Sequence, residues 1–287
     1  MKNWIRTTIP PVAFSASRWI TTKLQRIEVA DYHFLKTFKY RSDDVVIVSY
    51  PKSGSSWLRH ILTHLIIDMI HQAPHNIDFL CTQRLVPALS SEAQRKGKAN
   101  YEALPSPRIM RSHSLYSSRF PKVVYLLRDG RDALVSYYYH FRKFHGFVGG
   151  LHDFIQTIFR SQQQWSQHVD SWLFLNPSLS NLHVVRYEDL LRDPFPQIDA
   201  LLKFIGLSRT PRQIHRALEA STFDKMRHIE VTKGLGYVSE GNRQLYFVRK
   251  GKSGSWRDEF GPDEKDLVKT MYGTALIKTG YEKSFHW

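Results

Sequence analysis

The sequence predicts an α/β fold in which a central parallel sheet is flanked by helices on both faces. Short β-branched runs occur without interleaved polar residues, as in strands buried on both faces. Each run is followed by a turn-rich loop and then a helical pattern, which is the alternation of an α/β protein. The chain has 287 residues, 42% of them hydrophobic, enough for one large domain. We therefore expect residues 1–287 to form a single domain, with residues 1–40 as an N-terminal arm packing on or near it.

The first strand is expected within residues 44–50 (DVVIVSY), followed by a loop at 51–56 (PKSGSS). Residues 57–70 have a helical pattern, with Ser55 or Ser56 as the expected N-cap. This first strand–loop–helix unit sets the pattern for the rest of the chain.

A second unit has a strand at 123–127, a turn at 128–130 and a helix at 131–144. A third strand is expected at 182–186, with a helix around 194–205, and a weaker fourth strand at 108–111. Right-handed crossovers place the loops after these strands at one edge of the sheet, where ligands bind. Residues 76–107 and 234–254 are interpreted as insertions at that edge.

Charge and composition limit the classes of function. The chain carries 41 Lys and Arg against 26 Asp and Glu, a formal net charge of +15, which predicts an anionic partner. The single cysteine, Cys81, excludes an intrachain disulfide and Cys-based zinc sites, and it fits a reducing compartment. No run of 18 apolar residues exists, so we expect no membrane span. Residues 1–27 could lie on a membrane surface as a basic amphipathic arm, but packing on the domain is favoured.

The loop at residues 51–57 (PKSGSSW) has the composition of an anion cradle. Gly54 allows close approach of the backbone, and the first amides of the following helix point toward a bound anion. Lys52 adds a positive charge. The loop is not the nucleotide-kinase loop, because Lys52 precedes the glycine. A tight turn with an N-cap is the alternative interpretation.

Four landmarks make the chain similar to a known family. Residues 50–57 (YPKSGSSW) resemble the 5′-phosphosulfate loop, usually written YPKSGTTW, of sulfotransferases that use 3′-phosphoadenosine 5′-phosphosulfate (PAPS). Residues 124–140 resemble their 3′-phosphate motif, and residues 249–256 (RKGKSGSW) resemble their RKGxxGxW loop. With residues 187–189 (YED), the landmarks occur in the family's order. The resemblance implies a P-loop-like sulfotransferase fold and is closest to soluble, bacterial-like members.

The resemblance implies where the donor binds. It places the 5′-phosphosulfate on Lys52, Ser53, Gly54, Ser55, Ser56 and Trp57. It places the 3′-phosphate on Arg128, Ser136, Arg249, Lys250 and Gly251. It places the adenine near Trp57, Tyr187, Thr222 and Phe223. An Arg can bind a phosphate in a bidentate manner, which a Lys does less well. Without the motifs these residues would be read as core aromatics, a surface Arg and a helical Ser.

The resemblance also implies the catalytic residues Lys52, His113 and Arg111. Residues 110–113 (MRSH) are similar to the family's K-[TS]-H, with His113 as the general base. A neutral imidazole can accept a hydroxyl proton, although a lone His is more often structural. Arg111 stands where the family usually has Lys; its guanidinium can steady the sulfuryl group but cannot lose a proton. Lys52 can stabilise charge on the bridging oxygen.

A metal site is a competing interpretation of one helix. His60, His64 and Asp68 are spaced to share a face, as metal ligands could, but the motif HExxH is absent. We expect this stripe to be the polar side of the helix. Transfer of a singly charged sulfuryl group has little need of magnesium, so we expect no metal.

The leading hypothesis is an enzyme that transfers a sulfuryl group from PAPS to a hydroxyl, or less readily an amine, and releases adenosine 3′,5′-bisphosphate (PAP). A P-loop kinase is one alternative, which the loop sequence disfavours. A nucleic-acid or anionic-lipid binding protein is another, which would need its cations in one stripe with interleaved aromatics. We expect no nucleic-acid partner.

The acceptor is predicted only as a class. Its pocket is expected to be lined by Phe79, Tyr116, Phe144, Phe147, Tyr237 and Phe247. Aromatic lining favours a small cyclic, phenolic or alcoholic acceptor, such as a secondary metabolite, and a glycolipid remains an alternative because of the N-terminal arm. The dimerisation motif of the animal enzymes has no counterpart near the C-terminus, so the oligomeric state stays open. We expect a cytoplasmic enzyme.

Overall fold

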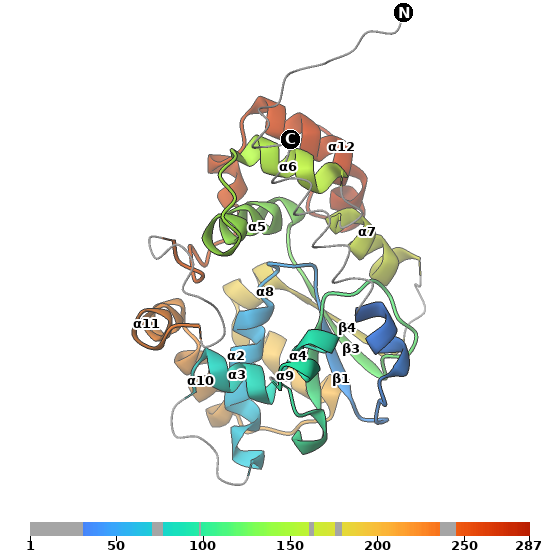
Figure 1. The fold of residues 1–287 in the computed structure, drawn as a ribbon, viewed down its shortest axis with the longest axis vertical. Coiled ribbons are helices and arrows are strands. Elements are labelled where there is room, and N and C mark those ends of the chain that lie inside the picture. The colour runs from blue at the N-terminus through green and yellow to red at the C-terminus, as the bar shows by residue number, and fades with distance from the viewer. Residues whose placement is uncertain (1–30, 71–76, 98, 161–163, 176–179, 236–244) are drawn as a thin grey trace, which may run out of the picture.

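A four-stranded parallel sheet forms the centre of the protein (Figure 1). The computed structural model describes residues 31–70, 77–97, 99–160, 164–175, 180–235 and 245–287. The strands are β1 (Val45–Val48), β2 (Ile109–Ser112), β3 (Lys122–Leu127) and β4 (Leu182–Arg186), in the order β2-β1-β3-β4. Every neighbouring pair is parallel. All four predicted strands are present, so the sheet expected from the sequence is confirmed.

Helices cover both faces of the sheet. One face carries α2 (Ser55–Ile66), α9 (Pro194–Ile205) and α10 (Pro211–Ala220). The other carries α5 (Gly130–Phe144), α6 (Leu151–Arg160), α7 (Trp165–Val169) and α12 (Pro262–Lys278). Shorter or peripheral helices are α3 (Phe79–Leu85), α4 (Ser91–Arg95), α8 (Tyr187–Arg192) and α11 (Phe223–Lys233). Single turns occur at Ile67–Met69, Tyr101–Ala103 and Ser255–Asp258, and a π-helical turn at Asp170–Phe174 follows α7.

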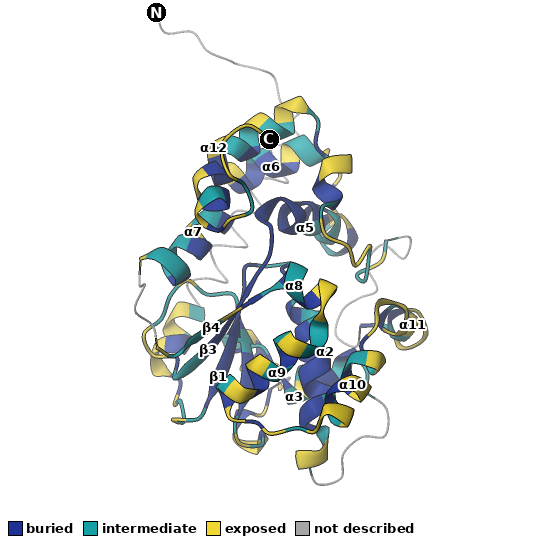
Figure 2. Cartoon of the chain, turned by 180° about the vertical axis from the view of Figure 1, so that it is seen from behind, coloured by how far each residue is buried: buried dark blue, intermediate teal, exposed yellow. Residues whose placement is uncertain are grey.

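The β-branched strands are explained by burial on both faces, since successive side chains of a strand point to opposite sides. Val46 and Val48 of β1 belong to the core under α5, whereas Val45 and Ile47 belong to the core under α2. Figure 2 shows β1 and β3 as buried between the helical layers. Val184 of β4 is 40% exposed because β4 is an edge strand. The core therefore has two compartments separated by the sheet.

The N-terminus of α2 differs from the prediction. Its N-cap is Gly54, with φ of 101° and no side-chain cap, and the helix begins at Ser55. The expectation that Ser55 or Ser56 caps α2 is wrong, because both serines already lie in the first turn. At α5, by contrast, Asp129 is a side-chain cap that accepts a hydrogen bond from the Arg131 amide.

Part of the predicted N-terminal arm packs on the core. Residues 31–37 are helical, and Leu35 and Phe38 are buried in the same core as β1. Asp31 accepts hydrogen bonds from the amide and hydroxyl of Ser91, both at 3.1 Å. Residues 1–30 lie outside the described residues. Among the described helices, none combines the length and apolarity needed to cross a bilayer.

A buried ion pair joins the starts of β1 and β2. Arg108 donates from Nε to Asp44 Oδ1 at 2.7 Å and from Nη2 to Asp44 Oδ2 at 2.6 Å. Both side chains are 0% exposed. Nη2 also donates to the Lys39 carbonyl at 2.9 Å. The pair therefore ties the segment before β1 to the edge strand β2.

Replacing Arg108 by methionine should lower the free energy of unfolding by about 3–5 kcal/mol, because the Asp44 carboxylate is then buried without its partner. Chemical denaturation measures the change. Arg41→Met is the control, since the Arg41–Glu102 pair is 38% and 78% exposed and should be worth less than about 1 kcal/mol. Equal stabilities of the two variants would contradict this account of the pair.

Candidate active site

The loops that follow β1 and β3 meet at the carboxyl edge of the sheet. Arg128, directly after β3, donates from Nη1 to the Lys52 carbonyl at 3.0 Å and from Nη2 to the Lys252 carbonyl at 3.2 Å. Its guanidinium lies 4.2 Å from the ring centroid of Tyr187. Nε of Arg128 is shielded and has no hydrogen-bond partner among the described residues. Three predicted donor-binding segments, distant in sequence, are therefore in contact.

The loop between β1 and α2 has the backbone of an anion cradle. Lys52 and Gly54 both have positive φ, at 70° and 101°. A Cβ at Gly54 would lie 2.6 Å from Cδ2 of Tyr187, so the position requires glycine. The Ser53 hydroxyl is buried without a partner among the described residues. The first amides of α2 have no carbonyl partner within the helix, which leaves them available to an anion.

Lys52 is held in an unusual electrostatic environment. Its Nζ lies 4.2 Å from the ring centroid of Phe247. Burial, followed by the positive charge of Arg128, lowers the pKa of Lys52 to about 7, while the negative charge of Glu230 opposes this shift. An anion beside Lys52 would favour its protonated form.

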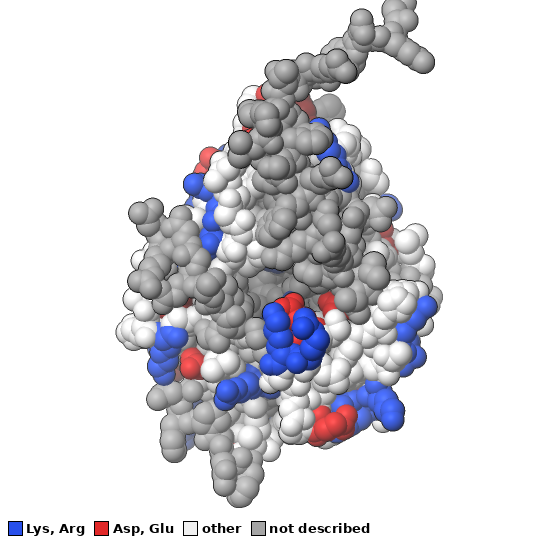
Figure 3. Space-filling view, in the orientation of Figure 1, with Lys and Arg blue, Asp and Glu red and all other residues white. Residues whose placement is uncertain are grey.

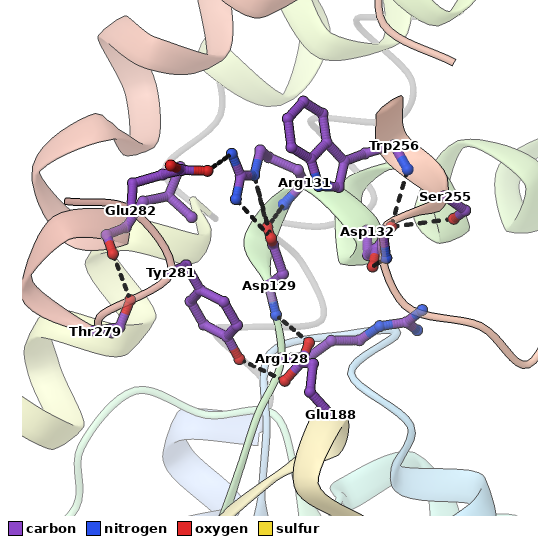
Figure 4. A network of polar contacts seen from close by, with 12 residues as sticks. Arg128, Asp129, Arg131, Asp132, Glu188, Ser255, Trp256, Thr279, Tyr281 and Glu282 are labelled. Atoms are coloured by element: carbon purple, nitrogen blue, oxygen red, sulfur yellow. Dashed lines mark hydrogen bonds and ion pairs between the residues drawn. The ribbon is translucent and has the colours of Figure 1, made fainter. Parts of the chain in front are cut away.

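A buried polar network holds the turn after β3 (Figure 4). The Asp129 amide donates to Glu188 Oε1 at 3.0 Å, and the Tyr281 hydroxyl donates to Glu188 Oε2 at 2.8 Å. Arg131 donates from Nη2 to Asp129 Oδ2 at 2.8 Å and also pairs with Glu282. The network ties α8 and the C-terminal segment to the residue next to Arg128.

Asp132, in the first turn of α5, anchors the C-terminal loop. It accepts hydrogen bonds from the Gly254 amide at 2.7 Å, the Ser255 hydroxyl at 3.0 Å and the Trp256 amide at 3.0 Å. Figure 4 shows the Ser255 hydroxyl and the Trp256 amide directed toward this carboxylate, whereas the Trp256 ring lies against Arg131. The predicted RKGxxGxW loop is thereby fastened to the helix that follows Arg128.

The cations of that loop pair with an acidic residue. Arg249 Nη1 lies 3.4 Å and Lys250 Nζ 3.0 Å from Glu259 Oε1. Burial lowers the pKa of Arg249; among the nearby charges Glu259 raises it and Arg128 lowers it. A Cβ at Gly251 would lie 2.4 Å from Cδ2 of Phe223, so Gly251 packs directly on that ring.

Glu230 of α11 fixes the segment that precedes these cations. Its carboxylate accepts the Phe247 amide at 2.6 Å and the Val248 amide at 2.8 Å. Lys143 of α5 lies 3.7 Å from Glu230 and donates to the Leu245 carbonyl. Glu230, Lys143 and Arg227 together form a clamp on this segment. Because hydrogen bonds to a charged group are strong, the clamp sets the position of Phe247, whose ring lies over Lys52.

Arg227, one turn earlier on α11, completes the clamp. It donates from Nε to the Val248 carbonyl at 2.6 Å and from Nη2 to the Arg249 carbonyl at 2.7 Å. Its guanidinium also lies 4.0 Å from the ring centroid of Tyr246. The clamp, Lys143, Arg227 and Glu230, thus binds the backbone of residues 245–249 from two helices.

Two of the aromatic residues predicted near the adenine are in contact. Trp57 and Tyr187 have ring centroids 5.7 Å apart, and Trp57 donates from Nε1 to the Ser221 carbonyl at 2.8 Å. That bond fixes the segment leading to Thr222, the N-cap of α11, and to Phe223, which is 37% exposed. Ser136 is partly buried on α5, the helix that begins two residues after Arg128.

His113 lies just beyond the end of β2. Its Nδ1 is 2.6 Å from the Ser49 carbonyl, which can only accept, so Nδ1 carries the hydrogen and Nε2 the lone pair. Burial, followed by the positive charge of Arg111, lowers its pKa well below the ordinary value for histidine. Arg111 lies opposite Ile47 in the sheet register. A neutral ring with its lone pair on Nε2 is the state required of a general base.

The structure gathers only some of the predicted acceptor-pocket residues. The ring centroid of Phe247 is 6.1 Å from that of Phe79 and 6.4 Å from that of Phe144. Tyr116 instead lies against Trp172, with centroids 5.3 Å apart. Phe147 is buried in the core under α5. Tyr237 lies outside the described residues.

The stripe on α2 proposed as a metal alternative is occupied by other contacts. His60 Nδ1 is 2.8 Å from the Ser221 hydroxyl, and the His60 and His64 centroids are 4.8 Å apart. Burial lowers the pKa of each ring to about 4. Within the described residues, no three or more His, Cys, Asp or Glu side chains are grouped as metal ligands.

Comparison with known proteins decides the family. The model of the family described as a sulfotransferase domain matches residues 42–280. The chain belongs to the sulfotransferase family. Rat sulfotransferase 1C2 is 28% identical over 280 residues, covering 88% of this sulfotransferase and 91% of the relative. Flavonol 3-sulfotransferase of Flaveria bidentis is 26% identical, with 85% of each chain covered.

Solved structures share the fold of this sulfotransferase. Mouse sulfotransferase SULT7A1 complexed with PAP has a TM-score of 0.66 at 19% identity, covering 88% of this chain and 91% of that one. Retinol dehydratase in complex with androsterone and the inactive cofactor PAP has a TM-score of 0.65 at 22% identity, covering 88% and 85%. The sulfotransferase fold predicted from the motifs is thus confirmed.

The surface charge bears on the binding-protein alternative. On the face in Figure 3, the Lys and Arg side chains of the described residues stand in separate groups, with acidic and uncharged side chains between them. A binder of nucleic acid or anionic lipid would instead be expected to present a continuous basic stripe. The family assignment replaces the two alternatives considered from the sequence, a P-loop kinase and a nucleic-acid or anionic-lipid binding protein.

Several residues that organise this sulfotransferase site were missed from the sequence. Asp132 lies inside a recognised motif, and its position in the first turn after Arg128 was an available signal. Arg227 and Glu230 lie on one helix, and no local pattern relates them to the loop at 245–249. Only the packing of α11 against that loop reveals their role.

Replacing Glu230 by alanine should loosen the loop that carries Phe247. The Phe247 and Val248 amides lose their charged acceptor, so we expect their hydrogen exchange to accelerate about tenfold or more. Hydrogen-exchange mass spectrometry of a peptide covering residues 245–250 measures this. Glu219→Ala, an exposed residue of α10, is the control. Unchanged exchange in Glu230→Ala would show that the loop is held by other contacts.

Proposed function

We propose that this enzyme transfers a sulfuryl group from PAPS to a hydroxyl, or less readily an amine, of a small-molecule acceptor and releases PAP. The contact of Arg128 with the Lys52 carbonyl at 3.0 Å carries the proposal. It joins the loop proposed for the 5′-phosphosulfate to the residue proposed for the 3′-phosphate. A donor with negative charge at both ends of an adenosine suits two adjacent cationic segments.

The residues at the edge of the sheet fit the 5′ end of this donor. The partnerless Ser53 hydroxyl and the left-handed backbone at Lys52 and Gly54 suit an anion that accepts several hydrogen bonds. We assign Lys52, Ser53, Gly54, Ser55, Ser56 and Trp57 to this end. PAPS supplies the sulfuryl group, and Lys52 stabilises the negative charge that develops on the departing oxygen.

The 3′-phosphate and the adenine are assigned to the neighbouring segments. The shielded Nε of Arg128 is available as a donor, and guanidinium groups bind phosphate well. Arg249 and Lys250 now pair with Glu259. To bind the same phosphate, they must leave Glu259 and pair with the phosphate instead. The assigned set for these parts of the donor is Arg128, Ser136, Tyr187, Thr222, Phe223, Arg249, Lys250 and Gly251.

His113 is assigned as the base that removes the acceptor proton. The Ser49 carbonyl at 2.6 Å holds its Nδ1 hydrogen, so Nε2 is the atom that receives a proton. Arg111 places a permanent positive charge beside this ring and beside Lys52. Arg111 can therefore steady the negative sulfuryl group, but it cannot act as an acid or base. No step of this mechanism needs a metal ion.

The acceptor is proposed to be a small cyclic or phenolic molecule. The ring of Phe247 lies beside Lys52, and the rings of Phe79 and Phe144 lie beside that of Phe247. These rings suit a flat apolar ligand. Retinol dehydratase, a structural neighbour, has been solved with androsterone, which agrees with a small-molecule acceptor.

We also infer a cytoplasmic location, because the single cysteine, Cys81, is a buried free thiol, as suits a reducing compartment.

Binding of PAP should weaken as the pH rises from 7 to 9. Lys52 of the free protein loses its proton above a pKa of about 7, and a bound phosphate favours the protonated form. PAP binding then takes up a proton, so affinity falls by up to about tenfold per pH unit. Calorimetry at several pH values measures this. Lys52→Arg should bind with little pH dependence in this range; the same slope in that variant would contradict the assignment.

Replacing His113 by alanine should lower kcat by about 10²- to 10³-fold, because the acceptor hydroxyl then lacks a general base. PAP affinity should stay unchanged. Transfer from radiolabelled PAPS to a panel of phenols and alcohols, with calorimetry of PAP binding, separates the two effects. His286→Ala, exposed near the C-terminus, is the control. A loss confined to PAP affinity would assign His113 to binding instead.

A further inference from the structure

His140 of α5 lies in the aromatic region beside the proposed catalytic residues. Its ring centroid is 4.8 Å from that of Phe144 and 6.4 Å from that of Phe247. The centroid of the same Phe247 ring lies 4.2 Å from Lys52 Nζ. We call the rings of Phe79, Phe144 and Phe247 the aromatic cup. His140 therefore stands at the side of this cup, near the proposed point of sulfuryl transfer.

His140 is neutral at this position. Burial, followed by the positive charge of Lys52 and then by its neighbours His145 and His113, lowers its pKa far below the ordinary value for histidine. A neutral imidazole has one N–H donor and one nitrogen lone pair, so each ring nitrogen can form one hydrogen bond.

One ring nitrogen of His140 forms no hydrogen bond with the described residues. Nδ1 is shielded from solvent and has no hydrogen-bond partner among the described residues. Most buried polar atoms in folded proteins are paired, so an unpaired one requires an explanation. The three members of the cup are phenylalanines, whose side chains have no polar atom. Nδ1 of His140 is thus a buried polar atom beside apolar rings.

We propose that His140 is a specificity-determining residue that binds a second hydroxyl of the acceptor, so that the enzyme prefers aromatic diols to phenols with one hydroxyl. This inference rests on the proposed function. A hydroxyl both donates and accepts, and it therefore satisfies Nδ1 whichever tautomer the ring adopts. An acceptor without that hydroxyl leaves the nitrogen buried and unpaired, which lowers its relative kcat/KM.

The test compares 2,3-dihydroxynaphthalene with 2-naphthol as acceptors of radiolabelled PAPS. These molecules have the same ring system, and the doubled number of reactive hydroxyls accounts for a factor of about two by itself. The wild-type enzyme should favour the diol by about tenfold or more in kcat/KM, within the range expected for one buried hydrogen bond. His140→Phe keeps an aromatic ring but removes the polar atom, and its preference should fall to about twofold.

His145→Phe is the matched control, because His145 directly follows α5 and its ring centroid lies 5.5 Å from that of His140. This variant should keep the preference for the diol. Calorimetry of PAP binding on all three proteins reports on the donor site independently of the acceptor. Unchanged PAP affinity in His140→Phe is expected, since the substitution alters only the acceptor side.

Several results would overturn the inference. A wild-type preference of about twofold or less would mean that Nδ1 is satisfied in another way, for example by water. Retention of the full preference by His140→Phe would assign the selectivity to another residue. An equal fall for both acceptors would make His140 part of the general chemistry rather than of specificity. A wild-type enzyme that binds PAP but accepts neither naphthol also contradicts the inference, whereas failure to bind PAP contradicts the proposed function.

Discussion

The parallel pairing of β1 with β2 on one side and β3 on the other determines where the reactive side chains lie. Val46 of β1 is opposite Met110 of β2 and opposite Val123 of β3. Because the three strands run in the same direction, their following loops emerge at one edge. The cradle after β1, His113 after β2 and Arg128 after β3 are therefore neighbours in space, although up to 76 positions separate Lys52 and Arg128 in the sequence.

Cationic side chains gather at the carboxyl edge of the sheet. Acidic residues bind the backbone amides and cations of the segments that carry them. Glu188 receives the amide of Asp129, next to Arg128, and Glu230 receives the amides that position Phe247. Glu259 pairs with Arg249 and Lys250. These carboxylates hold the backbone and the cations that surround the cradle. Burial, followed by the positive charge of Arg128, lowers the pKa of Lys52, and a bound anion would favour its protonated form.

The strands were predictable because burial on both faces demands apolar, β-branched residues, and that demand is local. Helix α5 was predictable to within a residue from the same reasoning, whereas the N-cap of α2 was not. Gly54, rather than a serine, begins that helix because the loop needs a left-handed residue packed against Tyr187. Among the acceptor-pocket predictions, Phe79 and Phe144 meet Phe247, but Phe147 is buried elsewhere. Aromatic composition alone cannot distinguish a core ring from a ring that faces a ligand.

The sequence by itself determined the fold class, the order of the strand–loop–helix units and the motifs that hold the donor-site residues. Those features depend on residues that are close along the chain, so their signal is local. The tertiary structure decided the tautomer of His113, the clamp on residues 245–249 and the position of His140 beside the aromatic cup. Each of these depends on contacts between helices and loops far apart in sequence, and such contacts form only when the two layers pack on the sheet.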